Sequence, residues 1–169
     1  MNKREVIISI KPTWCKLIAN GEKVYEIRKR APKEETPFKA YIYCSMKNTS
    51  DPQQYMELHT DTKIYKCNGH IIGEFICDDI VCLKWAENSE LQNVSKGAKL
   101  SIAEISNYGG VYAWHISHFK IYDAPKNISE FGLIRAPQSW AYSKKFLTLA
   151  AAYAIIRVEN NRKSSESQY

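Results

Sequence analysis

The feature that most constrains the fold is a series of short segments with the composition of β-strands. They are rich in β-branched and aromatic residues and cover residues 6–11, 24–29, 40–45, 70–85 and 112–123. Most of them follow one another without the helix that joins parallel strands in a doubly wound sheet. The chain also lacks the glycine-rich motifs GxGxxG and GxxxxGK[ST]. We therefore predict an α+β protein, built as a small, mostly antiparallel β-barrel with short helices at its ends.

Three further patterns predict helices. Pro12 suits the first turn of a short helix, which the Asn-Gly pair at residues 20–21 ends. Ser101 and Glu104 have the spacing of a capping box, which begins a second helix. Residues 143–158 combine a helical apolar stripe with a high alanine content, and this predicts a third helix near the C-terminus.

These patterns also suggest how the chain is divided. We expect residues 1–142 to form one domain, residues 143–158 to form a C-terminal helix outside it, and residues 159–169 to form a flexible polar tail. Residues 46–69 are polar, and we expect them to form an exposed, irregular insertion.

Composition excludes several classes of protein. With 169 residues, 44% of them hydrophobic, the chain can bury a core without disulfides or metal ions. No apolar run approaches the roughly 20 residues of a membrane span, and the apolar stretch at residues 6–10 is too short for a signal peptide. The five cysteines are odd in number and lack zinc-ligand spacing, so we expect reduced, mostly buried thiols. We predict a cytoplasmic protein with no membrane contact, metal or cofactor.

Positive charge is concentrated at the N-terminal end. Of the net charge of +6, residues 1–30 supply +5, from eight basic and three acidic side chains. A local basic excess is typical of proteins that bind a phosphate-rich partner. A charged face that only keeps the protein soluble explains the same pattern.

The densest group of candidate functional residues follows the first predicted helix. Lys23 comes just after the helix end, and Glu26 and Arg28 lie two residues apart on a strand, so their side chains share one face. A carboxylate beside a planar guanidinium can bind the edge of a base or hold a phosphate. The alternative is a surface ion pair, which contributes only about 0–1 kcal/mol to stability.

These residues resemble a known family. The sequence Ser9-Ile10-Lys11-Pro12, the helix after it, and the pattern Gly21-x-Lys23-x-x-Glu26-x-Arg28 are similar to the ASCH (activating signal cointegrator homology) domain of the PUA-like superfamily. Residues 40–45, 72–75 and 112–131 resemble the variant found in phage and mobile-element proteins, and the resemblance runs from about residue 4 to about residue 142.

The resemblance implies a small β-barrel with a cleft beside the first helix, and binding of RNA, a nucleobase or a nucleotide there. The family's Lys-x-x-Glu-x-Arg positions correspond to Lys23, Glu26 and Arg28. Some relatives are amidohydrolases acting on N4-acylated cytidine and others are ribonucleases. The amidohydrolase subgroup carries threonine where this chain has Glu26.

We predict that the cleft binds RNA or a modified nucleoside. Phosphate would be neutralised by Lys11, Lys23 and Arg28, and the positive surface would be extended by Lys29 and Arg30. Glu26 would accept a hydrogen bond from an exocyclic amine or a ribose hydroxyl. The candidates for stacking on a base are Trp14, Tyr43 and Trp114, although each also suits core or sheet packing.

Two alternatives remain open. In the first, the cleft is the active site of a hydrolase, an N4-acylcytidine amidohydrolase or a ribonuclease, in which Lys23 is the base and Glu26 its partner. His115 is a further candidate general base. In the second, the chain is a protein-interaction module that binds its partner through the helix at residues 143–158.

Overall fold

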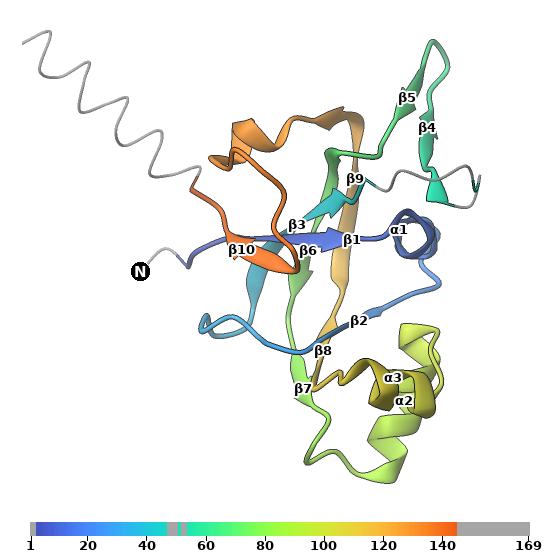
Figure 1. Ribbon diagram of the computed structural model, residues 1–169, viewed down its shortest axis with the longest axis vertical. Helices are drawn as coiled ribbons and strands as arrows, with labels where there is room; N and C mark the ends of the chain where they lie inside the picture. The colour runs from blue at the N-terminus through green and yellow to red at the C-terminus, as the bar shows by residue number, and fades with distance from the viewer. Residues whose placement is uncertain (1–2, 47–50, 52–53, 145–169) are drawn as a thin grey trace, which may run out of the picture.

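The computed structural model describes residues 3–46, 51 and 54–144 (Figure 1). In chain order, its strands are β1 (Val6–Ile10), β2 (Tyr25–Arg28), β3 (Phe38–Cys44), β4 (Glu57–His59), β5 (Ile64–Lys66), β6 (His70–Cys77), β7 (Ile80–Cys82), β8 (Tyr112–His115), β9 (Ser117–Lys126) and β10 (Trp140–Tyr142). The helices are α1 (Pro12–Ala19), α2 (Asn88–Ala98), α3 (Ile102–Tyr108) and the short 3₁₀ helix η2 (Ile128–Phe131).

The main sheet has five strands in the order β10-β1-β3-β6-β9. Strands β1 and β3 run parallel, with Val6 beside Ala40 and Ile10 beside Cys44. The other neighbouring strands of this sheet are antiparallel. The chain passes from β1 to β3 through α1 and β2, which gives the parallel pair the long connection that it requires.

A second sheet, in the order β2-β8-β7, lies beside α2 and α3 (Figure 1). Strands β4 and β5 form a separate hairpin that projects from the body of the molecule. The predicted α+β class with mostly antiparallel pairing is confirmed. Within the described residues, the strands are hydrogen-bonded as three separate sheets rather than as one closed ring. The described residues of the insertion at 46–69 are largely exposed as expected, but they contain this hairpin and are not irregular throughout.

Strand β2 is buried on both faces, and this arrangement creates the site described below. Ile27 packs in a core with side chains of α2, α3 and β8, including Val94, Ile105 and Ala113. Glu26 is also buried, although its side chain lies on the other face of the strand. The larger core fills the space between the main sheet and α1. Its buried members include Val6, Ile8, Cys15, Ile18, Ile42, Phe75 and Trp114.

The capping patterns predict their helices well. Helix α1 begins at Pro12 and ends before Asn20. Gly21 then adopts a φ of +74°, which only glycine takes up without strain. Helix α3 has the predicted capping box, in which the Ser101 hydroxyl accepts from the backbone N–H of Glu104 and the carboxylate of Glu104 accepts from the backbone N–H of Ser101.

Three elements differ from the sequence predictions. Residues 70–85 have the composition of one strand, but they supply β6 to the main sheet and β7 to the second sheet, and the break falls at Asp78 and Asp79. The polar composition of residues 88–98 indicates no helix, yet they form α2, whose buried residues are Val94 and Ala98. The pattern of residues 112–123 predicts one strand ended by Pro125. Instead, the chain bends at Ile116 and supplies β8 to one sheet and β9 to another. Pro125 is tolerated within β9 because that strand lies at the edge of the main sheet.

The state of the cysteines agrees with the sequence prediction. All five cysteines are free, four of them buried and Cys82 half-buried, as predicted. Burial raises the pKa of Cys67 to about 11 and that of Cys77 to about 12, so these thiols stay protonated near neutral pH.

Within the described part of the chain, no helix has the length and apolar content to cross a membrane. The predicted C-terminal helix at residues 143–158 lies almost wholly outside the described residues, the predicted tail lies wholly outside them, and the domain boundary at residue 142 stays a prediction.

Candidate functional site

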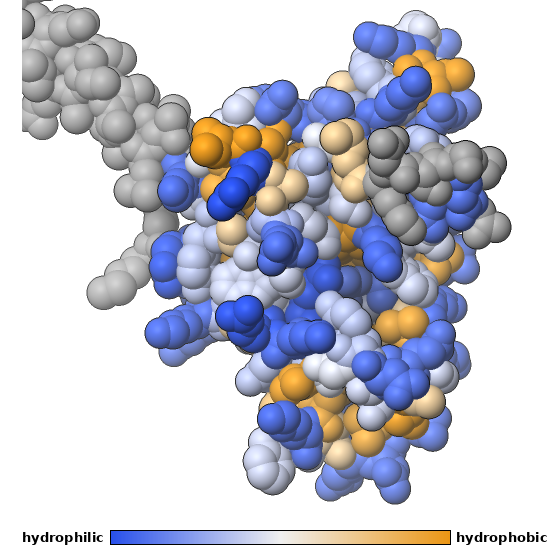
Figure 2. Space-filling model, viewed as in Figure 1, coloured by the Kyte–Doolittle hydropathy of each residue, from blue (hydrophilic) through white to orange (hydrophobic). Residues whose placement is uncertain are grey.

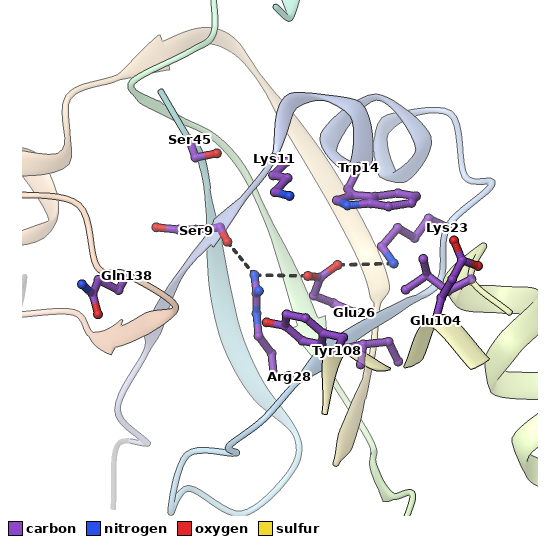
Figure 3. A pocket seen from close by; sticks show the side chains of 12 residues that line it. Ser9, Lys11, Trp14, Lys23, Glu26, Arg28, Ser45, Glu104, Tyr108 and Gln138 are labelled. Carbon is purple, nitrogen blue, oxygen red and sulfur yellow. Dashed lines mark hydrogen bonds and ion pairs between the residues drawn. The ribbon is translucent and has the colours of Figure 1, made fainter. Parts of the chain in front are cut away.

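A pocket of about 400 Å³ opens beside α1, between β2 and the end of β1 (Figure 3). Twelve residues from widely separated segments line it: Ser9, Lys11, Trp14, Lys23, Glu26, Ile27, Arg28, Ser45, Leu100, Glu104, Tyr108 and Gln138. We call it the binding pocket. Its volume lies within the range of roughly 300–1,000 Å³ that is typical of small-molecule sites.

Lys23 is held at the back of the binding pocket by the turn after α1. The backbone N–H groups of Glu22 and Lys23 both donate to the carbonyl of Leu17, which fixes this turn. The Lys23 ammonium donates to the carbonyl of Ala98 at 2.8 Å and lies 5.0 Å from the centre of the Trp14 ring. Burial lowers the pKa of Lys23, and the Arg28 charge adds to this effect, while Glu26 opposes it.

Glu26 lies between two cations. Its Oε2 is 3.4 Å from the Lys23 Nζ, and its Oε1 is 3.1 Å from the Arg28 Nη2. Arg28 also donates to the carbonyl of Ser9, which ties β2 to β1. The exposed fractions of Lys23, Glu26 and Arg28 are only 2%, 5% and 8%. The alternative of a surface ion pair is therefore wrong, because these three charges are buried together.

Two polar atoms in this cluster lack a hydrogen-bond partner among the described residues. They are Glu26 Oε2, which is within ion-pair distance of Lys23 but lacks hydrogen-bond geometry, and Arg28 Nε. Buried polar groups in folded proteins are nearly always hydrogen-bonded. Both atoms belong to side chains that line the binding pocket.

Four of the other predicted residues lie in the binding pocket or next to it. Lys11, which is exposed, and Trp14, which is half-buried, both line the binding pocket. Lys29 and Arg30 lie next to it, in a second hollow of about 420 Å³ that shares Tyr108 and Gln138 with it.

Three predicted residues lie elsewhere. Trp114 stands opposite Glu26 in the β2–β8 register, but its ring is fully buried against Phe38 and Trp140, so the stacking prediction for it is wrong. Tyr43 is buried in a cluster that includes Phe131 and does not line the binding pocket. The prediction for it is wrong as well.

His115 also lies outside the binding pocket. In β8, its side chain points to the opposite face of the strand from that of Trp114. Its Nδ1 is 2.6 Å from Asp78 Oδ1, and its ring centre is 5.0 Å from that of Tyr25. His115 is therefore not placed to act as a general base in the pocket.

Sequence reasoning missed several lining residues: Ser45, Leu100, Glu104, Tyr108 and Gln138. None of them lies near the Lys23-x-x-Glu26-x-Arg28 pattern in the chain, so no local signal marks them. Glu104 is noticeable in the sequence only as a helix cap. Its hydrogen bonds with Ser101 lower its pKa, so it brings a negative charge to the exposed rim.

The fold is similar to that of ASCH structures from Zymomonas mobilis. A serine-to-alanine variant of that protein matches with a TM-score of 0.60 and 18% identity, over 89% of this chain and 97% of the other. A second ASCH structure from this organism matches with a TM-score of 0.59 and 20% identity, over 89% and 94%. No family model matches the sequence, and no curated protein does. The chain therefore has the fold that its resemblance to the ASCH domain predicts.

Proposed function

We propose that the binding pocket holds an unpaired nucleobase, either in single-stranded RNA or in a free or modified nucleoside. The observation that carries this proposal is the buried Lys23–Glu26–Arg28 cluster, in which Glu26 Oε2 and Arg28 Nε have no hydrogen-bond partner among the described residues. A base edge offers both donors and acceptors for such groups, and a ribose hydroxyl does the same.

Each group has a role that follows from its chemistry. Glu26 accepts a hydrogen bond from an exocyclic amine or a ribose hydroxyl, and Arg28 donates to a carbonyl or ring nitrogen beside it. The half-buried ring of Trp14 lies at the same pocket and offers a surface on which a base stacks. Stacking combined with contacts to base edges is how proteins recognise unpaired RNA bases.

Charge supports a ligand that contains phosphate. Exposed Lys11 lines the pocket, and among the described residues it forms no ion pair. Figure 2 shows hydrophilic surface across the middle of the molecule, between the main sheet and the region of α2 and α3. Binding that neutralises phosphates releases counterions, so affinity falls as salt rises.

The test is the affinity for a short fluorescent single-stranded RNA. The wild type should bind it with an affinity that drops steeply between about 50 and about 200 mM salt. Glu26→Gln should weaken binding about 10- to 100-fold, because it removes a charged acceptor from a buried site. Glu74→Gln is the matched control, a half-buried carboxylate outside the pocket, and should leave affinity unchanged. Salt-independent binding, or equal losses in the two variants, would contradict the proposal.

A hydrolase is the second candidate, and the lowered pKa of Lys23 favours it. Burial increases the neutral fraction of this amine, which can then act as a base with Glu26 as its partner. Incubation with N4-acetylcytidine and with single-stranded RNA tests this function. Product must form with the wild type and disappear in both Lys23→Ala and Glu26→Ala. Product that forms equally with both variants would come from a contaminant.

The interaction-module alternative depends on residues 143–158, which lie almost wholly outside the described residues. It stays a prediction, and self-association measured with and without residues 143–169 tests it.

A further inference from the structure

The second hollow continues the binding pocket along the surface. It is lined by Lys29, Arg30, Tyr108, Gln138, Ser139 and Trp140. Tyr108 and Gln138 belong to both cavities. In Figure 3, Gln138 and Trp14 lie at opposite ends of the binding pocket, with Arg28 between them. A molecule longer than one nucleoside can therefore extend from the Trp14 end, past Gln138, into the second hollow.

The second hollow carries charges that the protein itself does not neutralise. Lys29 and Arg30 directly follow Arg28 in the chain, and both are exposed. Among the residues that the structure describes, neither forms an ion pair. Arg28, in contrast, is paired with Glu26 at 3.1 Å. The binding pocket thus has the chemistry to recognise a base, and the second hollow has the free cations that suit a phosphate.

The walls of the second hollow are aromatic. Tyr108 is 45% exposed, with the Lys29 ammonium 5.2 Å from its ring centre. Trp140 is held in place because its indole N–H donates to the carbonyl of Arg30 at 3.1 Å and its ring packs against Trp114. An exposed ring beside unpaired cations is the combination that proteins use to bind single-stranded nucleic acid without reading its sequence.

We propose that the second hollow binds the nucleotide next to the base in the binding pocket, so that the ligand is a single-stranded oligonucleotide and not a free nucleoside. Lys29 and Arg30 contact the phosphates that join the two nucleotides and follow them. Tyr108, at the border of the two cavities, stacks on the adjoining base. This inference rests on the proposed function, since it takes the binding pocket to hold the first base.

The experiment compares two ligands in two variants. The ligands are cytidine 5′-monophosphate and a short single-stranded RNA of mixed sequence, with DNA of the same sequence as a further arm. The test variant is Lys29→Gln/Arg30→Gln. The control is Lys84→Gln/Lys96→Gln, which removes the same charge from exposed positions that line neither cavity. Thermal unfolding checks that both variants fold.

We expect the test variant to bind the RNA about tenfold more weakly while its affinity for the mononucleotide changes less than about twofold. The slope of log affinity against log salt should fall by about 1.4, because two phosphate contacts to a single strand are lost. The control should change neither value. Tighter binding of either strand than of the mononucleotide supports the inference, and the ratio of RNA to DNA affinity identifies the preferred sugar.

The inference is overturned if the test variant weakens both ligands equally, or weakens the RNA no more than the control does. Wild type that binds the mononucleotide as tightly as the RNA also overturns it, while leaving the proposed function intact. Wild type that binds neither ligand overturns the proposed function itself.

Discussion

Buried and half-buried carboxylates occur in two regions of this protein, and they are used differently. In the binding pocket, Glu26 lies between Lys23 and Arg28. On the main sheet, Glu74 accepts from the Tyr122 hydroxyl at 2.6 Å and lies 3.2 Å from the Lys39 ammonium. Glu74 is half-buried, so water can complete its hydrogen bonds, whereas Glu26 Oε2 is buried and, apart from its ion pair with Lys23, has no hydrogen-bond partner among the described residues. The difference supports the proposal that the pocket cluster binds a ligand, whereas the sheet cluster stabilises the fold.

A second pair of a tyrosine and a carboxylate lies close to the first on the main sheet. The Tyr41 hydroxyl donates to Glu5 at 2.6 Å, so the sheet carries two tyrosine–carboxylate bonds. Burial and these bonds raise the pKa of Tyr41 and of Tyr122. Burial alone would raise the pKa of Glu74, but its bonds to Tyr122 and Lys39 more than offset this and lower it. In the pocket, burial acts against the charged form of Lys23 and lowers its pKa.

The largest expected effect is on stability, in the pocket. Glu26→Ala should lower the free energy of unfolding by about 3–5 kcal/mol, because it leaves the buried charges of Lys23 and Arg28 without their carboxylate. Urea unfolding of the wild type and the variant measures this. A loss below about 1 kcal/mol would show that solvent screens the cluster, and the contrast with the sheet would then disappear.

A smaller effect is expected on the sheet. Tyr122→Phe and Tyr41→Phe should each cost about 1–2 kcal/mol, since each removes one hydrogen bond to a carboxylate that water can still reach. Affinity for single-stranded RNA should stay unchanged in both variants, because neither residue lines the binding pocket. An RNA affinity that falls as far as in Glu26→Gln would assign the sheet cluster to the ligand site.

The smallest expected effect is on the pH dependence of stability in alkaline solution. There the two regions change the free energy of unfolding in opposite directions as pH rises. The folded-state pKa of Lys23 is lowered, so the unfolded chain binds more protons and the Lys23 contribution to stability rises with pH up to about 10.5. The pKa values of Tyr41 and Tyr122 are raised. Their contribution is fully present below 10, the ordinary value for tyrosine, and is lost as pH rises above it.

The variants separate these two slopes. Unfolding free energy measured against pH should lose its rise in Lys23→Met, and should lose part of its fall above pH 10 in Tyr122→Phe. A rise that survives in Lys23→Met would have to come from another group, and Lys23 would then not be the buried amine that sets this slope.

Much of the local structure could be predicted from short stretches of sequence. Pro12 marks the start of α1, Gly21 supplies the turn after it, and the Ser101–Glu104 pair caps α3. Cap and turn preferences depend on a few adjacent residues, which explains their success. Helix α2 was missed because its sequence is polar and its stability comes from contacts with distant residues.

Part of the candidate site could also be predicted from the sequence. The spacing of Glu26 and Arg28 places their side chains on one face of a strand, and both line the pocket together with Lys23. The sequence could not show that Trp114 and Tyr43 are buried or that His115 lies outside the binding pocket. Alternation along a strand separates its two faces but does not show what covers each face. Tyr108 and Gln138 carry no local signal at all.

The sequence by itself determined which charges stand together and the order of strand, helix and strand that presents them, since those features depend on neighbours in the chain. Only the tertiary structure decided that this polar face of β2 is a buried pocket and not a solvated surface. Burial depends on segments far away in the sequence, such as the end of α2, where the Ala98 carbonyl accepts from the Lys23 ammonium across 75 positions. Their positions follow from how the whole core packs, which a strand of four residues cannot encode.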